Sequence, residues 1–205
     1  MKRWLVLGLL VCACGSDNKN NTTPDAGSTG SGTITGSVGG QPLTVKDAVF
    51  AVGNNTAIVM VTDRANICPL LAGATLPGPT TALLFSIANF VPPSTLNPLV
   101  TGDYAFFDLA ADGGTLPSTA GQYWYGEFDG VDANCALTSN HVADGGTVSI
   151  TQVGNTSGTH LKANLTGIRF GTDALNGSFE AIYCPALGNS SCGAGALLAR
   201  PPAAE

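Results

Sequence analysis

The chain has 205 residues, a formal net charge of −6 and 11% charged residues, whereas charged residues make up about 25% of an average soluble domain. With 44% apolar residues and only eight basic ones, the sequence excludes an intrinsically disordered protein and a nucleic-acid-binding surface. The length suits a single domain with a sizeable core.

The N-terminus has the organisation of an export signal. Lys2 and Arg3 precede an apolar run from Trp4 to Val11. This run is much shorter than the roughly 20 apolar residues that are needed to span a bilayer. The sequence therefore predicts a signal peptide over residues 1–13.

The predicted signal ends at a cysteine. Cys14 follows the small residue Ala13, and the apolar Val11 stands three positions before Cys14. This pattern resembles the lipobox of bacterial lipoproteins. The resemblance implies cleavage by signal peptidase II and a lipid on Cys14. Cys12 is an alternative anchor, and an ordinary secretory signal is the alternative to lipidation. Because Gly15 rather than Asp follows Cys14, the enterobacterial sorting rule implies the outer membrane.

Residues 14–31 are predicted to be the lipidated cysteine and a flexible tether, because Ala26 is the only apolar residue from 15 to 31. Removal of the signal peptide takes away two basic residues, which leaves six basic and 14 acidic ones and a net charge of −8. An acidic body does not favour anionic headgroups, so we expect the lipid to be the contact with the membrane.

The body, residues 32–192, is a series of short apolar stretches separated by Gly, Asn, Asp and Pro. This spacing predicts an all-β fold of eight to ten short strands with one short helix, either an antiparallel β-sandwich or, alternatively, a β-barrel. The helix is expected over 63–72 with Asp63 as its cap, and residues 193–205 are expected to be a disordered tail. The strands are expected at 33–38, 43–45, 48–52, 56–62, 81–90, 104–109, 122–128, 147–153, 161–165 and 175–183.

One short segment, Ala-Asp-Gly-Gly-Thr, occurs twice, at 111–115 and at 143–147. Asp-Gly pairs tolerate the backbone conformations of tight hairpin turns. We interpret the two copies as two similar turns.

Four cysteines remain in the mature body, and an even number in an exported protein predicts disulfide bonds. Three connectivities are possible. We favour a local bond between Cys184 and Cys192, and Cys68–Cys135 then follows by elimination. The spacing of these four cysteines does not match a zinc site.

An acidic segment containing Glu127, Asp129 and Asp132 follows an aromatic stretch. Carboxylate oxygens are ligands that calcium prefers, although the spacing does not match an EF-hand loop. We interpret the segment as a solvated turn, with a calcium site as the alternative. No other metal and no cofactor is expected.

The densest aromatic patch is Tyr123, Trp124 and Tyr125. Alternation along a strand places Trp124 on one face and the two tyrosines on the other. We interpret the patch as plain packing, and the alternative is that exposed rings of this kind bind a sugar or a protein partner. The sequence contains no Gly-x-Ser-x-Gly motif and no glycine-rich phosphate loop, so no catalytic residue is assigned and a non-enzymatic role is expected.

Four segments of the body carry a resemblance to a known group of proteins. They are Gly-Thr-Ile-Thr-Gly-Ser-Val-Gly-Gly-Gln-Pro-Leu-Thr-Val-Lys-Asp-Ala at 32–48, then residues 63–68, 146–148 and 177–181. These segments resemble small uncharacterised lipoproteins of the type found in myxobacterial genomes. The resemblance implies the same β architecture and lipidation, and it carries no assigned activity. We therefore expect an envelope lipoprotein that binds a protein or glycan partner, with a structural or assembly component of the outer membrane, or a hydrolase, as alternatives.

Overall fold

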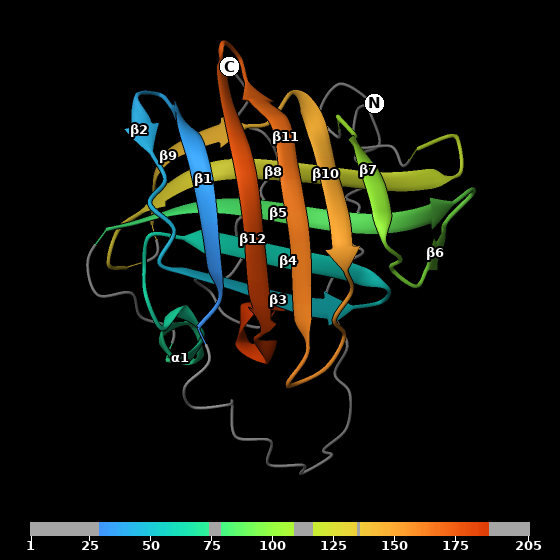
Figure 1. Cartoon of the computed structure of the whole chain (residues 1–205), viewed down its shortest axis with the longest axis horizontal. Helices are drawn as coiled ribbons and strands as arrows, with labels where there is room; N and C mark the ends of the chain where they lie inside the picture. Colours follow the sequence, from blue (N-terminus) through green and yellow to red (C-terminus); the bar gives the residue numbers. More distant parts are fainter. Residues whose placement is uncertain (1–28, 74–78, 109–116, 135, 189–205) are drawn as a thin grey trace, which may run out of the picture.

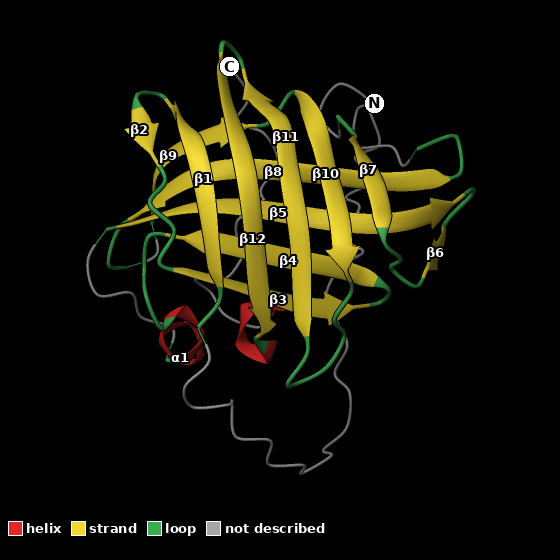
Figure 2. Cartoon of the chain, in the orientation of Figure 1, coloured by secondary structure: helices red, strands yellow, loops and turns green. Residues whose placement is uncertain are grey.

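The computed structural model describes residues 29–73, 79–108, 117–134 and 136–188. Within these ranges the chain is almost entirely β-structure, which confirms the all-β prediction (Figure 2). The elements are β1 (Ser31–Val38), β2 (Gln41–Pro42), β3 (Asp47–Gly53), β4 (Thr56–Thr62), α1 (Ile67–Ala72), β5 (Thr80–Val91), β6 (Thr95–Asn97), β7 (Gly102–Phe106), β8 (Gly121–Val131), β9 (Leu137–Val142), β10 (Gly145–Gln152), β11 (His160–Phe170), β12 (Asp173–Tyr183) and the 3₁₀ turn η1 (Pro185–Gly188).

The strands form two layers whose directions cross (Figure 1). The front layer contains β1, β12, β11, β10 and β7, and the back layer contains β3, β4, β5 and β8, with β6 beside β5 and β9 beside β8. Most neighbours are antiparallel. The layers are joined by two short parallel pairings, β12 with β3 and β7 with β8. Eight strands therefore form a closed barrel, and of the two predicted architectures the barrel is the one that the structure shows.

The closure depends on two long strands that change partners along one edge. β12 pairs with β1 through Glu180 and then with β3 from Ile182. β8 pairs with β7 at Tyr123 and Trp124 and then with β9 from Glu127. Each of these strands thus belongs to the edge of one layer and also reaches the other layer.

The inside of the barrel is filled by apolar side chains from both layers. Trp124, Tyr104, Phe50, Phe85 and Phe128 are all 1% exposed or less. The ring of Phe85 lies 5.7 Å from that of Trp124, and the ring of Phe128 packs against the β11 side of the core. Interiors packed in this way are a core rather than a ligand cavity.

The back layer also buries its outer face, where a second apolar cluster lies under α1 and η1. Met60 of β4 and Leu84 of β5 point outwards into this cluster, while Val59 and Val61 point into the barrel. Burial on both faces explains why β4 has an unbroken apolar sequence rather than an alternating one.

Helix α1 begins four residues later than its predicted start, and Asp63 is not its cap. The Asp63 carboxylate accepts a hydrogen bond from the Thr81 N–H instead. Asn66, in the left-handed conformation, precedes the helix, and the first helical N–H, that of Ile67, donates to the carboxylate of Asp47 at 2.9 Å.

The described body begins close to the boundary predicted between tether and body. Ser31 is the first residue of β1, and the N–H of Gly30 donates to the buried Asp47 carboxylate at 2.7 Å. The predicted signal peptide, most of the tether and the predicted tail lie outside the described residues. Among the described residues, no helix has the length and apolar character required to cross a membrane.

The segment at 143–147 is not a hairpin turn, because it leads from β9 into β10 and these two strands have different neighbours: β9 pairs with β8, whereas β10 pairs with β11 and β7. Asp144 fastens this connection to the end of β11. Its carboxylate accepts from Nε of Arg169 at 3.4 Å and from the N–H of Gly171 at 2.9 Å. The copy at 111–115 lies outside the described residues.

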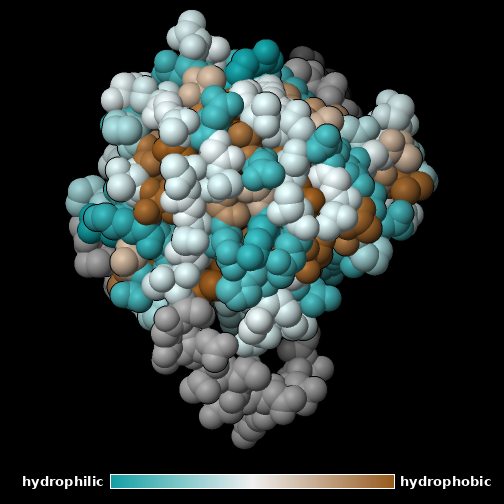
Figure 3. All heavy atoms as spheres, viewed as in Figure 1, coloured by the Kyte–Doolittle hydropathy of each residue, from teal (hydrophilic) through white to brown (hydrophobic). Residues whose placement is uncertain are grey.

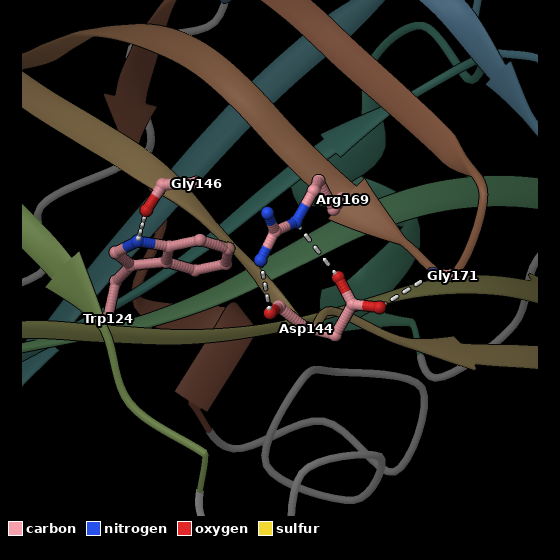
Figure 4. A network of polar contacts seen from close by, with 5 residues as sticks. All are labelled: Trp124, Asp144, Gly146, Arg169 and Gly171. Atoms are coloured by element: carbon pink, nitrogen blue, oxygen red, sulfur yellow. Dashed lines mark hydrogen bonds and ion pairs between the residues drawn. The ribbon is translucent and has the colours of Figure 1, made fainter.

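Gly146 in the same segment has a φ of 109°, a backbone conformation that residues with a side chain rarely adopt. A Cβ atom at this position would lie 2.3 Å from the carbonyl oxygen of Gly167. The carbonyl of Gly146 accepts a 3.3 Å hydrogen bond from Nε1 of Trp124 (Figure 4). This glycine therefore lets β10 approach β11 and also supplies a partner for the one polar atom of the buried indole.

Candidate functional site

The disulfide in the described chain joins Cys68 to Cys184, with Cα atoms 5.6 Å apart. Both favoured pairings, Cys68–Cys135 and Cys184–Cys192, are therefore wrong. The reason is tertiary, because Cys68 in α1 and Cys184 after β12 are 116 residues apart but meet over the outer face of the back layer. Cys135 and Cys192 lie outside the described residues.

The three aromatic residues of the predicted binding patch alternate as expected. Trp124 points into the barrel, and Tyr123 and Tyr125 are half-buried on the opposite face of β8. The hydroxyl of Tyr123 lies 2.7 Å from that of Thr119, and the hydroxyl of Tyr125 donates to Oε1 of Glu127 at 2.7 Å. All three side chains thus have partners within the protein.

The acidic segment is divided between two environments, which corrects its interpretation as one solvated turn. Asp132 does lie in an exposed turn, where its Oδ1 accepts from the N–H groups of Asn134 and Ala136. Glu127 and Asp129 instead lie in β8 and are 7% and 1% exposed. They share the outer face of β8 because they are two positions apart.

One side chain of β9 connects the two buried carboxylates. Nδ2 of Asn140 donates to Oε2 of Glu127 at 3.0 Å and to Oδ1 of Asp129 at 2.7 Å. The second oxygen of Asp129, Oδ2, is buried and has no hydrogen-bond partner in the described chain.

The titration of these groups reflects their burial. Burial raises the pKa of Asp129 from 3.8 to about 7, and the charge of Glu127 adds to this while the hydrogen bond from Asn140 opposes it. Burial also raises the pKa of Glu127, against the hydrogen bonds from Tyr125 and Asn140. The pKa of the Tyr125 hydroxyl is raised by burial and by Glu127, so this hydroxyl remains a donor at neutral pH.

A second polar feature lies on the outer face of the front layer. It is a shallow, open hollow of about 430 Å³ over β1, β10, β11 and β12. Figure 3 shows hydrophilic side chains gathered over β11 and β12 on this face. The hollow is lined by Ser31, Gly32, Thr33, Thr151, Lys162, Ala163, Asn164, Ser178, Phe179 and Glu180.

A charged cluster lies at this hollow. Glu180 is paired in register with Lys162, and their side chains are 2.9 Å apart, while Nδ1 of His160 lies 2.7 Å from the other carboxylate oxygen. The hydrogen bond from Lys162 is the main cause that lowers the pKa of Glu180. No site was predicted at these residues, although the alternation of His160 and Lys162 along one strand was a usable signal.

These two sites offer different chemistry. The hollow presents hydroxyl, amide and charged groups to solvent, which suits hydrogen bonding to a polar ligand. The β8–β9 cluster presents oxygen atoms that are buried. In the described chain, no three His, Cys, Asp or Glu side chains lie close enough together to hold a metal ion among themselves.

Comparison with protein families, with curated proteins and with solved structures finds no match to this chain.

Proposed function

We propose that this protein is a lipid-anchored component of the bacterial outer membrane whose barrel is a non-enzymatic binding module. The observation that carries the proposal is the difference between the two outer faces of the barrel. The back layer is covered by α1 and η1, whereas the front layer presents a polar hollow. The binding surface is then the outer face of β1, β12, β11 and β10.

The filled interior supports an external site. Barrels that hold a ligand inside keep a cavity between the strands, but here aromatic side chains from both layers occupy that space. A ligand therefore has to bind to the outside of the barrel.

The chemistry of the hollow favours a hydroxyl-rich ligand such as a glycan. Thr33, Thr151 and Ser178 offer hydroxyl groups that donate and accept hydrogen bonds, and Asn164 offers an amide. Lys162 adds a cation at the same surface. Hydrogen-bond groups with both donor and acceptor character match the hydroxyl groups of a sugar.

Binding is tested with the full chain in detergent against a panel of envelope polysaccharides and peptidoglycan fragments. We expect one class to bind, and Asn164→Ala and Lys162→Ala to weaken its binding about tenfold each, which corresponds to roughly 1.4 kcal/mol. Lys46→Ala, an exposed lysine outside the hollow, is the matched control. Binding that is equal in all three variants would place the ligand elsewhere.

Anchoring is tested separately with Cys14→Ser. We expect the wild-type chain to incorporate a labelled fatty acid and to sediment with outer membranes, and the variant to lose both properties. If Cys14→Ser still carries the label, the lipid is on Cys12. If the wild-type chain is not labelled, the protein is not lipidated and this part of the proposal fails.

A further inference from the structure

The outer face of β8 places two carboxylates side by side in a buried position. Glu127 and Asp129 are 7% and 1% exposed. Within the described chain, their side chains receive hydrogen bonds from only two neutral groups, the Tyr125 hydroxyl and the Asn140 amide. Buried charges in proteins are normally paired or bound to a metal ion.

No basic side chain of the described residues forms an ion pair with either carboxylate, because the ion pairs found there involve Glu180 and Asp144. A further negative charge acts on the neighbouring Tyr125, since Asp108 contributes to the raised pKa of its hydroxyl. The cluster therefore combines two buried carboxylates with one carboxylate oxygen, Oδ2 of Asp129, that has no partner among the described residues.

We propose that Glu127, Asp129 and Asn140 form a binding site for a hard divalent cation of the calcium class. Calcium prefers carboxylate and amide carbonyl oxygens and completes its coordination with water. The two carboxylates supply the charge, and Oδ2 of Asp129 supplies an oxygen to which no group of the described chain donates.

Asn140 has the right position to complete the set. Its amide nitrogen already lies 3.0 Å from Glu127 Oε2 and 2.7 Å from Asp129 Oδ1. Turning the amide over brings its carbonyl oxygen beside the two carboxylates in place of the nitrogen, which adds a third oxygen-bearing side chain to the set. The nitrogen of a side-chain amide donates hydrogen bonds and its oxygen accepts them. The amide of Asn140 can therefore donate to the carboxylates when no metal ion is bound and turn its oxygen towards the ion when one is bound.

The ion can reach this buried position through β9. In the described chain β9 pairs with β8 alone, and most of its residues are exposed. A short edge strand that is held on one side moves more easily than the strands of the closed barrel.

Asp132 does not belong to the site, although the sequence placed it with the other two acids. Its Oδ1 is engaged by the N–H groups of Asn134 and Ala136. Asp132 therefore provides a matched control, because it is an acid of the same segment with a different role.

The proposal is tested by melting the full chain in detergent after treatment with a chelator, with and without calcium. A ligand at 100 times its dissociation constant raises Tm by about 5–10 °C for a chain of this size. We expect such a rise with calcium and none with sodium at equal ionic strength. Terbium, a calcium substitute, should luminesce when tyrosine is excited, because Tyr125 adjoins the site, and calcium should displace it.

Asp129→Asn should abolish the rise in Tm and weaken terbium binding at least 100-fold, while Asp132→Asn should leave both unchanged. Glu127→Gln should act in the same way as Asp129→Asn, which guards against a defect confined to one variant. A wild-type chain without any calcium-dependent shift or terbium signal would overturn the proposal. Loss of binding in Asp132→Asn with retention in Asp129→Asn would overturn it as well.

Discussion

Asp47 and Asp129 are two aspartates with the same burial, each 1% exposed, and with opposite surroundings. Asp47 accepts hydrogen bonds from the backbone N–H groups of Gly30, Ala48 and Ile67. Asp129 accepts one from a side-chain amide, and its other oxygen has no partner within the described part of the chain.

The difference separates a structural carboxylate from a candidate binding one. Burial raises the pKa of both groups, but the backbone hydrogen bonds oppose this at Asp47. Through these hydrogen bonds Asp47 connects three segments: the residue before β1, the strand β3 and the start of α1. Asp129 connects only β8 to β9. Its carboxylate, when charged, is buried without an opposite charge among the described residues, and buried charges are normally paired.

The largest expected effect comes from Asp47→Ala, which leaves three backbone N–H groups without their acceptor. Because buried N–H groups without a partner destabilise by about 1–3 kcal/mol each, we expect a loss of about 3–5 kcal/mol in the free energy of unfolding. Urea denaturation measures it, with Asp132→Ala as a control in an exposed turn. If Asp47→Ala lost less free energy of unfolding than the control, Asp47 would not hold these segments together.

The next effect concerns the disulfide at the same end of the barrel. Replacing Cys68 and Cys184 together by alanine should lower the free energy of unfolding by about 2–4 kcal/mol, because the bond closes a long loop in the unfolded chain. Denaturation with and without reductant gives the value. Peptide mapping of the wild type should recover the Cys68–Cys184 link, and a different partner for Cys184 would contradict the structure.

Asp129→Asn should raise the free energy of unfolding, in contrast to the two changes above, and so stabilise the metal-free protein at pH 8. The shift of its pKa from 3.8 to about 7 corresponds to at most about 4 kcal/mol at 1.36 kcal/mol per pH unit, and we expect a gain of about 2 kcal/mol. Chemical denaturation in the presence of a chelator measures this gain. A variant less stable than the wild type at pH 8 would show that the carboxylate is well accommodated.

The same shift predicts a pH dependence. The folded protein binds a proton at Asp129 more tightly than the unfolded chain, so stability falls as pH rises from about 4 to about 7 and is then constant. An asparagine side chain does not titrate, so the stability curve of Asp129→Asn should lack this fall and meet that of the wild type near pH 4. Parallel curves for the two proteins would contradict the assignment to Asp129.

The smallest effect on stability is expected at the hollow. Lys162 and Glu180 are more than one third exposed, and exposed ion pairs contribute about 0.2–1 kcal/mol. Lys162→Ala should therefore change the free energy of unfolding by less than about 0.5 kcal/mol while weakening ligand binding. A large loss in the free energy of unfolding would show that the ion pairs of Glu180 stabilise the fold rather than serve ligand binding.

The strands were predictable because each has a local signal. β4 was expected over the same range that the structure shows, and the core side of β11 follows from alternate apolar residues such as Leu161 and Leu165. The alternation of Trp124 with its tyrosine neighbours was predictable for the same reason. The burial of the site residues was harder to predict. Glu127 falls in the strand expected at 122–128, but Asp129 lies beyond it, and their burial follows only from the pairing of β8 with β5 and β9.

The sequence by itself determined the all-β character and the position of most strands, and it predicts an anchor at Cys14, because these depend on residues close together along the chain. Only the tertiary structure decided that the two layers close into a barrel, that Cys68 pairs with Cys184, and that Asp129 is buried. Each of these depends on which distant strands become neighbours. That choice follows from the free energy of the whole packed core rather than from any local pattern.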